Sequence, residues 1–514
     1  MPSQQLPLEA VGAFPKLFLD YILKDKNLEK FYSQYPDIEG FKQVIEARKF
    51  TDDKRKTLVE VLEKQYQSFE IKPDFKLLLD SNTFTVTTGH QLNIFTGPLY
   101  VIYKIVTTIN LAKKLKAEFP AYNFVPVYWM ASEDHDFDEI SAFNLFGKKY
   151  QWKTEQKGAV GRMNPAELKS VFEEMTDKSA LFEQAYLSND TLAGAVRDYM
   201  HQLFGFDDLI CLDADDAALK AIFSHVIKDD LLNNSANEIV NKTSTELNNL
   251  GYHTQITPRE INFFFLQNNL RERIVKENNE FKILNSELSF SESEILQMLD
   301  NQPDVFSPNV VLRPLYQETI LPNLAYIGGP SEVPYWLQLK GIFDFYGEQF
   351  PLLMPRNFAL VINQASLKKI DKLGLTVEEL FIEEIALKRS FVERNSENSL
   401  SLAFEIDDVN EVFERIVKKS VAVDQTMKGA VEAEKAKIIS SLENLEKRIK
   451  KAEERNQEAS VSQLIALKQK LFPGGGLQER KDNFLNFYLH DTDFIKKLLA
   501  DFDPIDYRFN VIEI

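Results

Sequence analysis

Residues 83–131 constrain the fold more than any other part of the sequence. They begin with TFTVTT at 83–88, a run of β-branched residues that predicts a strand. A glycine turn, Thr96-Gly97-Pro98, leads into a helical pattern, LYVIYKIVTTINLAKKLKAEF, and a second apolar strand is expected at 123–131. Strand, turn, helix and strand form a βαβ unit, which requires a parallel sheet with a right-handed crossover.

The alternation of strands and helices continues over residues 81–366, which we predict to be one core domain. Apolar runs at 209–212, 262–266 and 351–363 predict further strands, the last of them as a final core strand. Helical patterns separate these runs. The sequence therefore predicts an α/β fold built on a parallel sheet.

Three segments precede or interrupt this core. Residues 1–80 place apolar residues three and four apart, as in KTLVEVLEKQYQSF, and are predicted to be a helical segment that packs on the core. Polar segments at about 141–190 and 250–310 break the α/β pattern. We interpret them as insertions, the first at the edge of the sheet.

Residues 367–471 have a different character, because Gly and Pro nearly vanish. Apolar residues recur every seven positions, with two more between them: Val431, Ile438, Leu445, Ala452 and Ala459, then Leu442 and Ile449. This spacing predicts a coiled-coil arm or helical hairpin, with a long helix packed inside its own domain as the alternative. The run ends at FPGGG, and residues 472–514 are predicted to return to the core.

Charge and composition exclude several classes of protein. Lys and Arg total 60 against 78 Asp and Glu, a net charge of −18, which disfavours an extended nucleic-acid interface. The single cysteine, Cys211, allows no internal disulfide and no cysteine zinc cluster. The first residues lack the pattern of a signal peptide, and no apolar run is long enough to span a membrane. We expect a cytoplasmic protein that binds neither membranes nor nucleic acid.

Two loops that follow the first two strands carry candidate site residues. Ligands of open α/β sheets bind where the strands end, so the first loop predicts a substrate site. Its members, with a neighbour from the second strand, are Gly89, His90, Gln91, Thr96, Gly97 and Trp129. The alternative is a turn with a capping histidine. After the second strand comes an acidic cluster, for which we predict catalytic roles: Glu133, Asp134, His135 and Asp136.

Carboxylates beside a histidine suit acid–base chemistry, and Glu133 and His135 form such a pair if their side chains converge. Alternate residues of an extended segment point to opposite sides, so the cluster does not serve one site as a whole. The alternative is a solvated acidic turn. No metal site is expected.

Three later segments add candidates. Asp213 and Asp215 follow a predicted strand and are candidate substrate ligands, with helix capping as the alternative. The YIGGPSE turn contributes Tyr326, Gly328, Gly329 and Glu332 as further substrate-binding candidates. In PGGGLQER a glycine run precedes an arginine, as in a phosphate-binding loop, but the Lys-Ser/Thr of a P-loop is missing. Its candidates for nucleotide binding are Gly475, Gln478 and Arg480; a flexible joint is the alternative.

Six segments together resemble one known family. TTGHQLNIFTGPLYVIYKIVTTINLAKKL, PVYWMASEDHDFDEI, LICLDADD, RPLYQETILPNLAYIGGPSEVPYWLQLKGIF, MPRN and FPGGGLQER match the bacillithiol-synthesis cysteine ligase family, BshC, in order along the whole chain. One departure is His90, where the family often carries glutamine. A neutral hydrogen-bonding role at this position is compatible with both residues.

The resemblance implies a Rossmann-like core with connecting-peptide insertions, similar to nucleotidyltransferases and class I aminoacyl-tRNA synthetases, and a coiled coil used for homodimerisation. It also implies the last step of bacillithiol synthesis, in which the carboxyl of L-cysteine is joined to the amine of glucosaminyl-malate. Such an amide bond requires an activated carboxylate, so ATP, giving ADP or AMP, and Mg²⁺ are expected. Two rivals stay open: another amino-acid-activating or nucleotidyl-transferring enzyme on this fold, and a non-catalytic dimeric scaffold.

Overall fold

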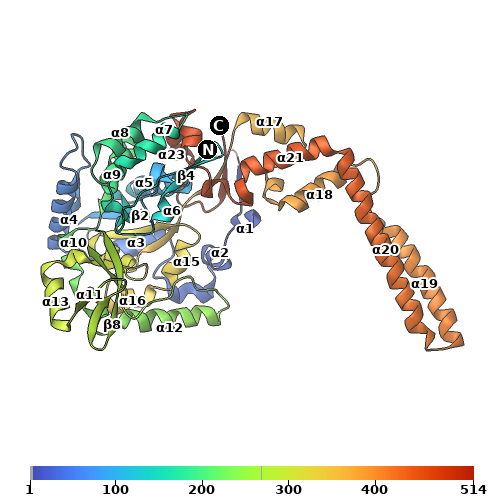
Figure 1. Cartoon of the computed structure of the whole chain (residues 1–514), viewed down its shortest axis with the longest axis horizontal. Coiled ribbons are helices and arrows are strands. Elements are labelled where there is room, and N and C mark those ends of the chain that lie inside the picture. Colours follow the sequence, from blue (N-terminus) through green and yellow to red (C-terminus); the bar gives the residue numbers. More distant parts are fainter. Residues whose placement is uncertain (1–3, 268) are drawn as a thin grey trace. The chain divides into compact units, whose positions relative to one another are not determined.

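The computed structural model describes residues 4–267 and 269–514, which divide into two compact units. The first unit contains residues up to 360 together with 478–512, and the second contains 361–477 with the last two residues. Figure 1 follows the chain through both. No helix of the described residues combines the length and the apolar character needed to cross a bilayer.

The centre of the first unit is a parallel sheet in the order β13-β12-β2-β3-β6. Its strands are β2 (Thr83–His90), β3 (Asn123–Met130), β6 (Ile210–Asp213), β12 (Asn323–Gly328) and β13 (Leu352–Pro355). The helix α5 (Tyr100–Glu118) connects β2 to β3, which confirms the expected βαβ unit.

Apolar side chains of two helices pack on this sheet. Leu111 and Leu115 of α5 and Phe41 and Val44 of α3 (Ile38–Ala47) share one buried cluster with residues of β2, β3, β12 and β13. The remaining helices of the N-terminal segment are α1 (Leu8–Val11), α2 (Lys16–Ile22) and α4 (Asp52–Gln65). This segment also begins with a strand, β1 (Gln4–Leu6), which pairs with β15 (Phe509–Glu513) and was not expected.

The segment at 351–363 was predicted as one strand, and this prediction is wrong. It forms β13 in the central sheet and β14 (Phe358–Ile362) in a second sheet with β1 and β15. Two buried polar residues, Arg356 and Asn357, separate the strands. Arg356 pairs with Glu479, and Asn357 bonds Thr107 and the Asp503 carbonyl, so the backbone leaves the central sheet to satisfy them.

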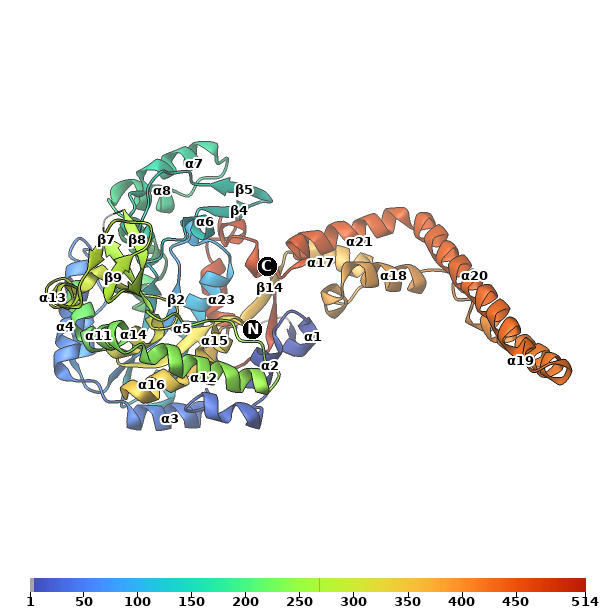
Figure 2. The same ribbon diagram turned by 60° about the horizontal axis from the view of Figure 1, so that its bottom comes forward.

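Both insertions carry sheet structure (Figure 2). The segment at about 250–310 forms an antiparallel sheet in the order β10-β9-β8-β7-β11, with β7 at Phe263–Gln267, β8 at Leu270–Glu277 and β11 at Phe306–Pro308. The segment at about 141–190 forms the hairpin β4 (Ala142–Leu145) and β5 (Lys148–Gln151), then α7 (Lys169–Glu174) and α8 (Ala180–Ser188). Its aromatic residues pack on Phe95, so it has a core of its own rather than a purely polar surface.

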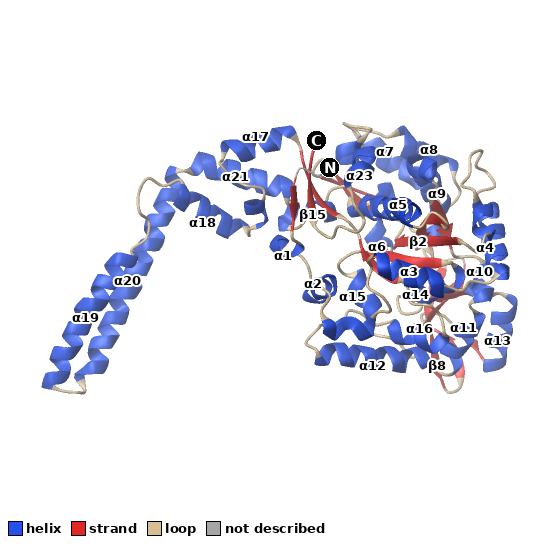
Figure 3. Ribbon diagram, turned by 180° about the vertical axis from the view of Figure 1, so that it is seen from behind, coloured by secondary structure: helices blue, strands red, loops and turns tan. Residues whose placement is uncertain are grey.

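The second unit is helical, as Figure 3 shows in blue, and consists of five α-helices among the described residues. They are α17 (Gln364–Lys372), α18 (Glu384–Arg394), α19 (Ala403–Val423), α20 (Met427–Asn456) and α21 (Glu458–Leu471). Three residues join α19 to α20, and the two helices lie side by side as an antiparallel hairpin. The heptad pattern does not run straight through, because α20 ends at Asn456 and Ala459 lies on α21.

Candidate functional site

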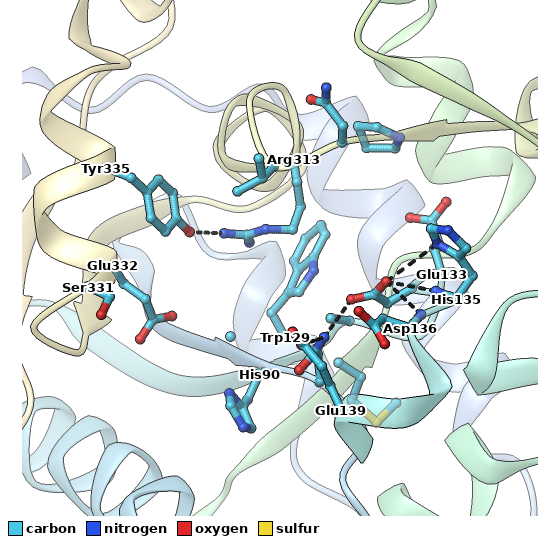
Figure 4. A pocket seen from close by; sticks show the side chains of 18 of the residues that line it. His90, Trp129, Glu133, His135, Asp136, Glu139, Arg313, Ser331, Glu332 and Tyr335 are labelled. Carbon is cyan, nitrogen blue, oxygen red and sulfur yellow. Dashed lines mark hydrogen bonds and ion pairs between the residues drawn. The ribbon is translucent and has the colours of Figure 1, made fainter. Parts of the chain in front are cut away.

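A cavity of about 840 Å³ opens where β2, β3 and β12 end (Figure 4). Parallel strands present their carboxyl ends at one edge of a sheet, so the loops that follow them converge there. The predicted site residues that line the cavity are Gly89, His90, Gln91, Trp129, Glu133, Asp134, His135, Asp136, Tyr326, Gly329, Glu332 and Arg480.

The other candidates do not line this cavity: Thr96, Gly97, Asp213, Asp215, Gly328, Gly475 and Gln478. Gly97 has a φ of 65°, and a Cβ there would lie 2.5 Å from the Cβ of Asn93, so its role is to allow a tight turn. Asp213 accepts a hydrogen bond from Ser132, and Asp215 forms a two-point ion pair with Arg162. These contacts give the two aspartates structural roles.

Glu133 is the most buried carboxylate on the acidic side of the cavity. The ammonium of Lys220, on α10 (Ala217–Ile222), donates to it and to the Phe306 carbonyl, which lies 2.7 Å away. The Lys220 side chain is fully out of solvent. Burial raises the pKa of Glu133, and the Lys220 charge opposes that rise without cancelling it. Glu133 is therefore a carboxylate that takes up a proton more readily than its exposed neighbours.

The pKa of Asp134 is shifted in the opposite direction from that of Glu133. Its carboxylate accepts from Gln91 Nε2 at 2.8 Å and from the backbone N–H of His135 at 2.7 Å. Burial alone would raise the pKa of Asp134, but the Gln91 hydrogen bond and the Arg271 charge lower it below its usual value. Asp134 therefore stays ionised and suits electrostatic binding better than proton transfer.

The predicted acid–base pairing of Glu133 with His135 is absent. His135 Nδ1 instead lies 2.7 Å from Nη1 of Arg271, which comes from the inserted strand β8. A guanidinium only donates, so Nδ1 accepts and the proton of the neutral ring sits on Nε2. Burial and the Arg271 charge lower the pKa of His135, which keeps the ring neutral. His135 thus offers the cavity a donor and not a base.

Glu332 is fixed at the start of α15 (Glu332–Leu337) by three donors. Lys104 Nζ approaches both carboxylate oxygens at 2.8 Å, and Tyr326 Oη and the Gly329 N–H donate at 2.7 and 2.8 Å. Burial opposes ionisation, but the Lys104 charge and these hydrogen bonds lower the pKa of Glu332 to about 2. Lys104 also donates to the Gly89 carbonyl, so one buried lysine ties two strand-end loops together.

His90 lies beside this lysine. Burial and the Lys104 charge lower the pKa of His90 to about 3, so the ring is neutral at physiological pH. A neutral ring is compatible with the hydrogen-bonding role predicted for this position.

The sequence interpretation missed residues outside the strand-end loops that line the cavity or hold its lining. Lys220 donates to Glu133 without lining the cavity itself, Arg271 lines it from an insertion, and Arg313 lines it from the start of the helix α14 (Arg313–Ile320). Arg313 belongs to the RPLYQET segment, which contributes to the family resemblance. That resemblance could therefore have pointed to Arg313 as a site residue. Nothing in the sequence pairs Lys220 with Glu133, because 87 residues separate them.

Metal-binding groups are not gathered in the described residues, where no three His, Cys, Asp or Glu side chains are placed to hold an ion. Cys211 is buried, and burial raises the pKa of its thiol to about 12, which leaves it protonated and unreactive.

One solved structure also aligns with the chain. It is titled a putative arginyl tRNA synthetase from Campylobacter jejuni, and the alignment covers 88% of this chain and 98% of that one. At 10% identity and a TM-score of 0.21, this likeness says nothing about the fold.

Comparison with known sequences gives a consistent family across the whole chain. The profile described as "Bacillithiol biosynthesis BshC, N-terminal Rossmann-like domain" matches residues 1–357, and that described as "Bacillithiol biosynthesis BshC, C-terminal coiled-coil domain" matches 359–514. Proteins named "Putative cysteine ligase BshC" are 43% identical in Flavobacterium psychrophilum, over all of both chains, and 40% identical in Cytophaga hutchinsonii, over 99% of this chain and 98% of that one. The chain therefore belongs to the bacillithiol biosynthesis BshC family, with a Rossmann-like domain followed by a coiled-coil domain.

Proposed function

We propose that this protein is a ligase that joins the carboxyl of L-cysteine to the amine of glucosaminyl-malate, the last step of bacillithiol synthesis. The names of its relatives support a cysteine ligase. The observation that carries the proposal is that one cavity is lined both by Glu133, held by buried Lys220, and by Arg313, which forms no ion pair within the described residues. An acceptor with an amine at one end and carboxylates at the other would contact both side chains.

Amide formation needs two activations. One oxygen of the cysteine carboxylate must eventually leave as part of a phosphate. That oxygen therefore first attacks ATP, which gives an acyl-adenylate with release of pyrophosphate or an acyl-phosphate with release of ADP. The acceptor amine then attacks the acyl carbon, the C–O bond to phosphate breaks, and AMP or phosphate leaves. The amine must shed a proton, and Glu133, with its raised pKa, is the carboxylate suited to take it.

Nucleotide is best accommodated near Arg480, whose exposed guanidinium lines the cavity. The described residues offer no cluster of metal ligands, so Mg²⁺ would enter with the nucleotide phosphates, as is usual for this ion. ATP and free L-cysteine are both cytoplasmic metabolites, which places the reaction in the cytoplasm.

Homodimerisation through the hairpin α19–α20 is part of the proposal. Large apolar side chains on both helices are exposed, among them Val412, Ile416 and Val423 on α19 and Ile438 and Leu445 on α20. Ile438 and Leu445 are seven residues apart and are 41% and 47% exposed, so the hairpin alone does not bury the predicted heptad face. A second hairpin packed on these residues would remove them from water.

The test is a mass-spectrometric assay of purified protein with L-cysteine, glucosaminyl-malate, ATP and Mg²⁺. Formation of bacillithiol only with ATP, with equal release of AMP or ADP, supports the ligase and identifies the activation. Glu133→Gln keeps the size of the side chain, and we expect its kcat to fall by about 10²-fold or more. Product from another amino acid or amine at a higher kcat/KM would assign a different acceptor or donor, and binding of substrate without any product would favour the scaffold.

A further inference from the structure

The cavity is lined by a large share of the chain's arginines. Six of the sixteen arginines in the sequence line it, whereas no lysine of the described residues does: Arg259, Arg271, Arg273, Arg313, Arg356 and Arg480. A guanidinium presents a planar fork of donors that matches a carboxylate or a phosphate. In a chain with a net charge of −18, this concentration indicates an anionic ligand.

Arg313 is partly exposed and differs in its partners from Arg271 and Arg356, the buried arginines of the cavity. Arg356 is paired with Glu479, and Arg271 lies 3.9 Å from a carboxylate oxygen of Asp134. Arg313 donates only to neutral groups: Nη1 to Gln317 Oε1 at 3.2 Å, and Nη2 to Tyr335 Oη at 3.0 Å. It forms no ion pair with a carboxylate of the described residues.

Gly89 lies next to the Arg313 guanidinium. A Cβ at Gly89 would be in van der Waals contact with Tyr326 Oη at 3.5 Å and Arg313 Nη1 at 3.6 Å, so a larger side chain there would occupy space beside the guanidinium. The Glu332 carboxylate acts on the Arg313 charge but is itself held by Lys104, so a bound carboxylate would give Arg313 an ion-pair partner of its own. The Arg313 guanidinium is thus placed to pair with an anion that enters the cavity.

Arg313 and Glu133 lie apart in the cavity. Figure 4 shows Arg313, Tyr335 and Glu332 on one side, Trp129 in the middle, and Glu133, His135 and Asp136 on the other. Because Glu332 is held by Lys104, a ligand with carboxylates at one end and an ammonium at the other would bind with its carboxylates at Arg313 and its ammonium at Glu133.

We propose that Arg313, together with the Tyr335 hydroxyl, binds the malate carboxylate of the acceptor and so directs its amine towards Glu133. The identity of the acceptor rests on the proposed function; the binding chemistry rests on the arginine. Nucleotide phosphate is the other anion that a guanidinium would accept, so the experiment separates the two sources.

The experiment is calorimetric titration of the full chain with four probes: glucosaminyl-malate, L-malate, glucosamine and ATP. For Arg313→Gln we expect a tenfold or greater loss of affinity for the first two and none for glucosamine or ATP. Arg313→Lys keeps the charge but not the fork and should bind at an intermediate level, and Tyr335→Phe should lose less than Arg313→Gln. Arg415→Gln removes an exposed arginine of α19 and is the charge control.

Circular dichroism and thermal melting identify any variant that fails to fold, and the conservative Arg313→Lys then carries the test. If Arg313→Gln lost affinity for ATP while its affinity for malate stayed unchanged, the proposal would be overturned, and Arg313 would be assigned to binding nucleotide phosphate. An equal loss for glucosamine would also overturn it. Because binding is measured without turnover, a wild-type protein that binds malate through Arg313 but makes no bacillithiol would overturn the function alone. Turnover by Arg313→Gln at an unchanged KM for glucosaminyl-malate would overturn the inference alone.

Discussion

The ammonium of Lys220 lies entirely out of solvent and donates a hydrogen bond to the carboxylate of Glu133, which lines the cavity. Lys220→Met removes the charge that opposes the effect of burial, so the pKa of Glu133 should rise further. We expect the acidic limb of kcat/KM against pH to move to higher pH by about one unit or more. Rates measured across the neutral range test this.

Lys220→Arg restores a cation and should return the limb towards its wild-type position. The double variant Glu133→Gln/Lys220→Met leaves no unpaired charge, so it should melt at a higher temperature than Lys220→Met alone. A pH profile that does not move in Lys220→Met would show that Glu133 is not the titrating base.

A second buried carboxyl makes stability depend on pH. Glu318 accepts hydrogen bonds from Gln317 and Asn323, and burial raises its pKa to about 7. A raised pKa in the folded state means that the stability is fully present below the unfolded pKa of 4.5 and is lost as the pH rises through 7. The loss is about 3 kcal/mol at alkaline pH. Glu318→Gln carries no charge, so its unfolding free energy should fall less between acidic and alkaline pH; urea titrations at several pH values measure it.

The exposed apolar face of the hairpin gives a prediction about assembly. Ile438→Glu/Leu445→Glu places two charges on that face, and we expect the double variant to sediment as a monomer under conditions where the wild type is a dimer. Ala433→Glu/Ala436→Glu adds the same charge at exposed positions on another face of α20 and should leave the dimer intact. Equal sedimentation of both variants would argue against this interface.

His135 should be neutral with its proton on Nε2, because Arg271 donates to Nδ1. In a proton–nitrogen correlation spectrum, Nδ1 should behave as an unprotonated, hydrogen-bonded nitrogen. Arg271→Leu removes the donor and the nearby charge, so the lowered pKa of His135 should rise towards 6.5. The resonance of His490, which does not line the cavity, is the internal control. A proton found on Nδ1 in the wild type would contradict this arrangement.

The parts of the fold that follow from local pattern could be predicted from the sequence. The βαβ unit from β2 to β3 and the long helices of 367–471 were expected, because a period of two or of 3.6 to seven residues reports directly on burial. The break between β13 and β14 could not be predicted from the sequence, because it depends on the partners of Arg356 and Asn357. Those partners, Glu479 and the Asp503 carbonyl among them, lie more than 100 residues away.

The same distinction applies to the site. Residues in the loops after parallel strands, such as Gln91 and Glu133, could be named because the topology brings strand ends together. Lys220 and Arg271 could not be named, since Lys220 lies on the helix α10 and Arg271 comes from an inserted antiparallel sheet. The role of His135 could not be predicted from the sequence either, because its tautomer is set by Arg271 and not by its neighbours in the chain.

The ion pair between Arg356 and Glu479 has a consequence for synthesis on the ribosome. Both side chains are almost fully buried, and the whole helical unit lies between them in the chain. A nascent chain that has emerged only as far as residue 470 holds Arg356 without its counter-charge and lacks Arg480. The cavity lining is therefore completed late in translation, and a chain cut short within the helical unit would lack Arg480 however well its sheet had formed.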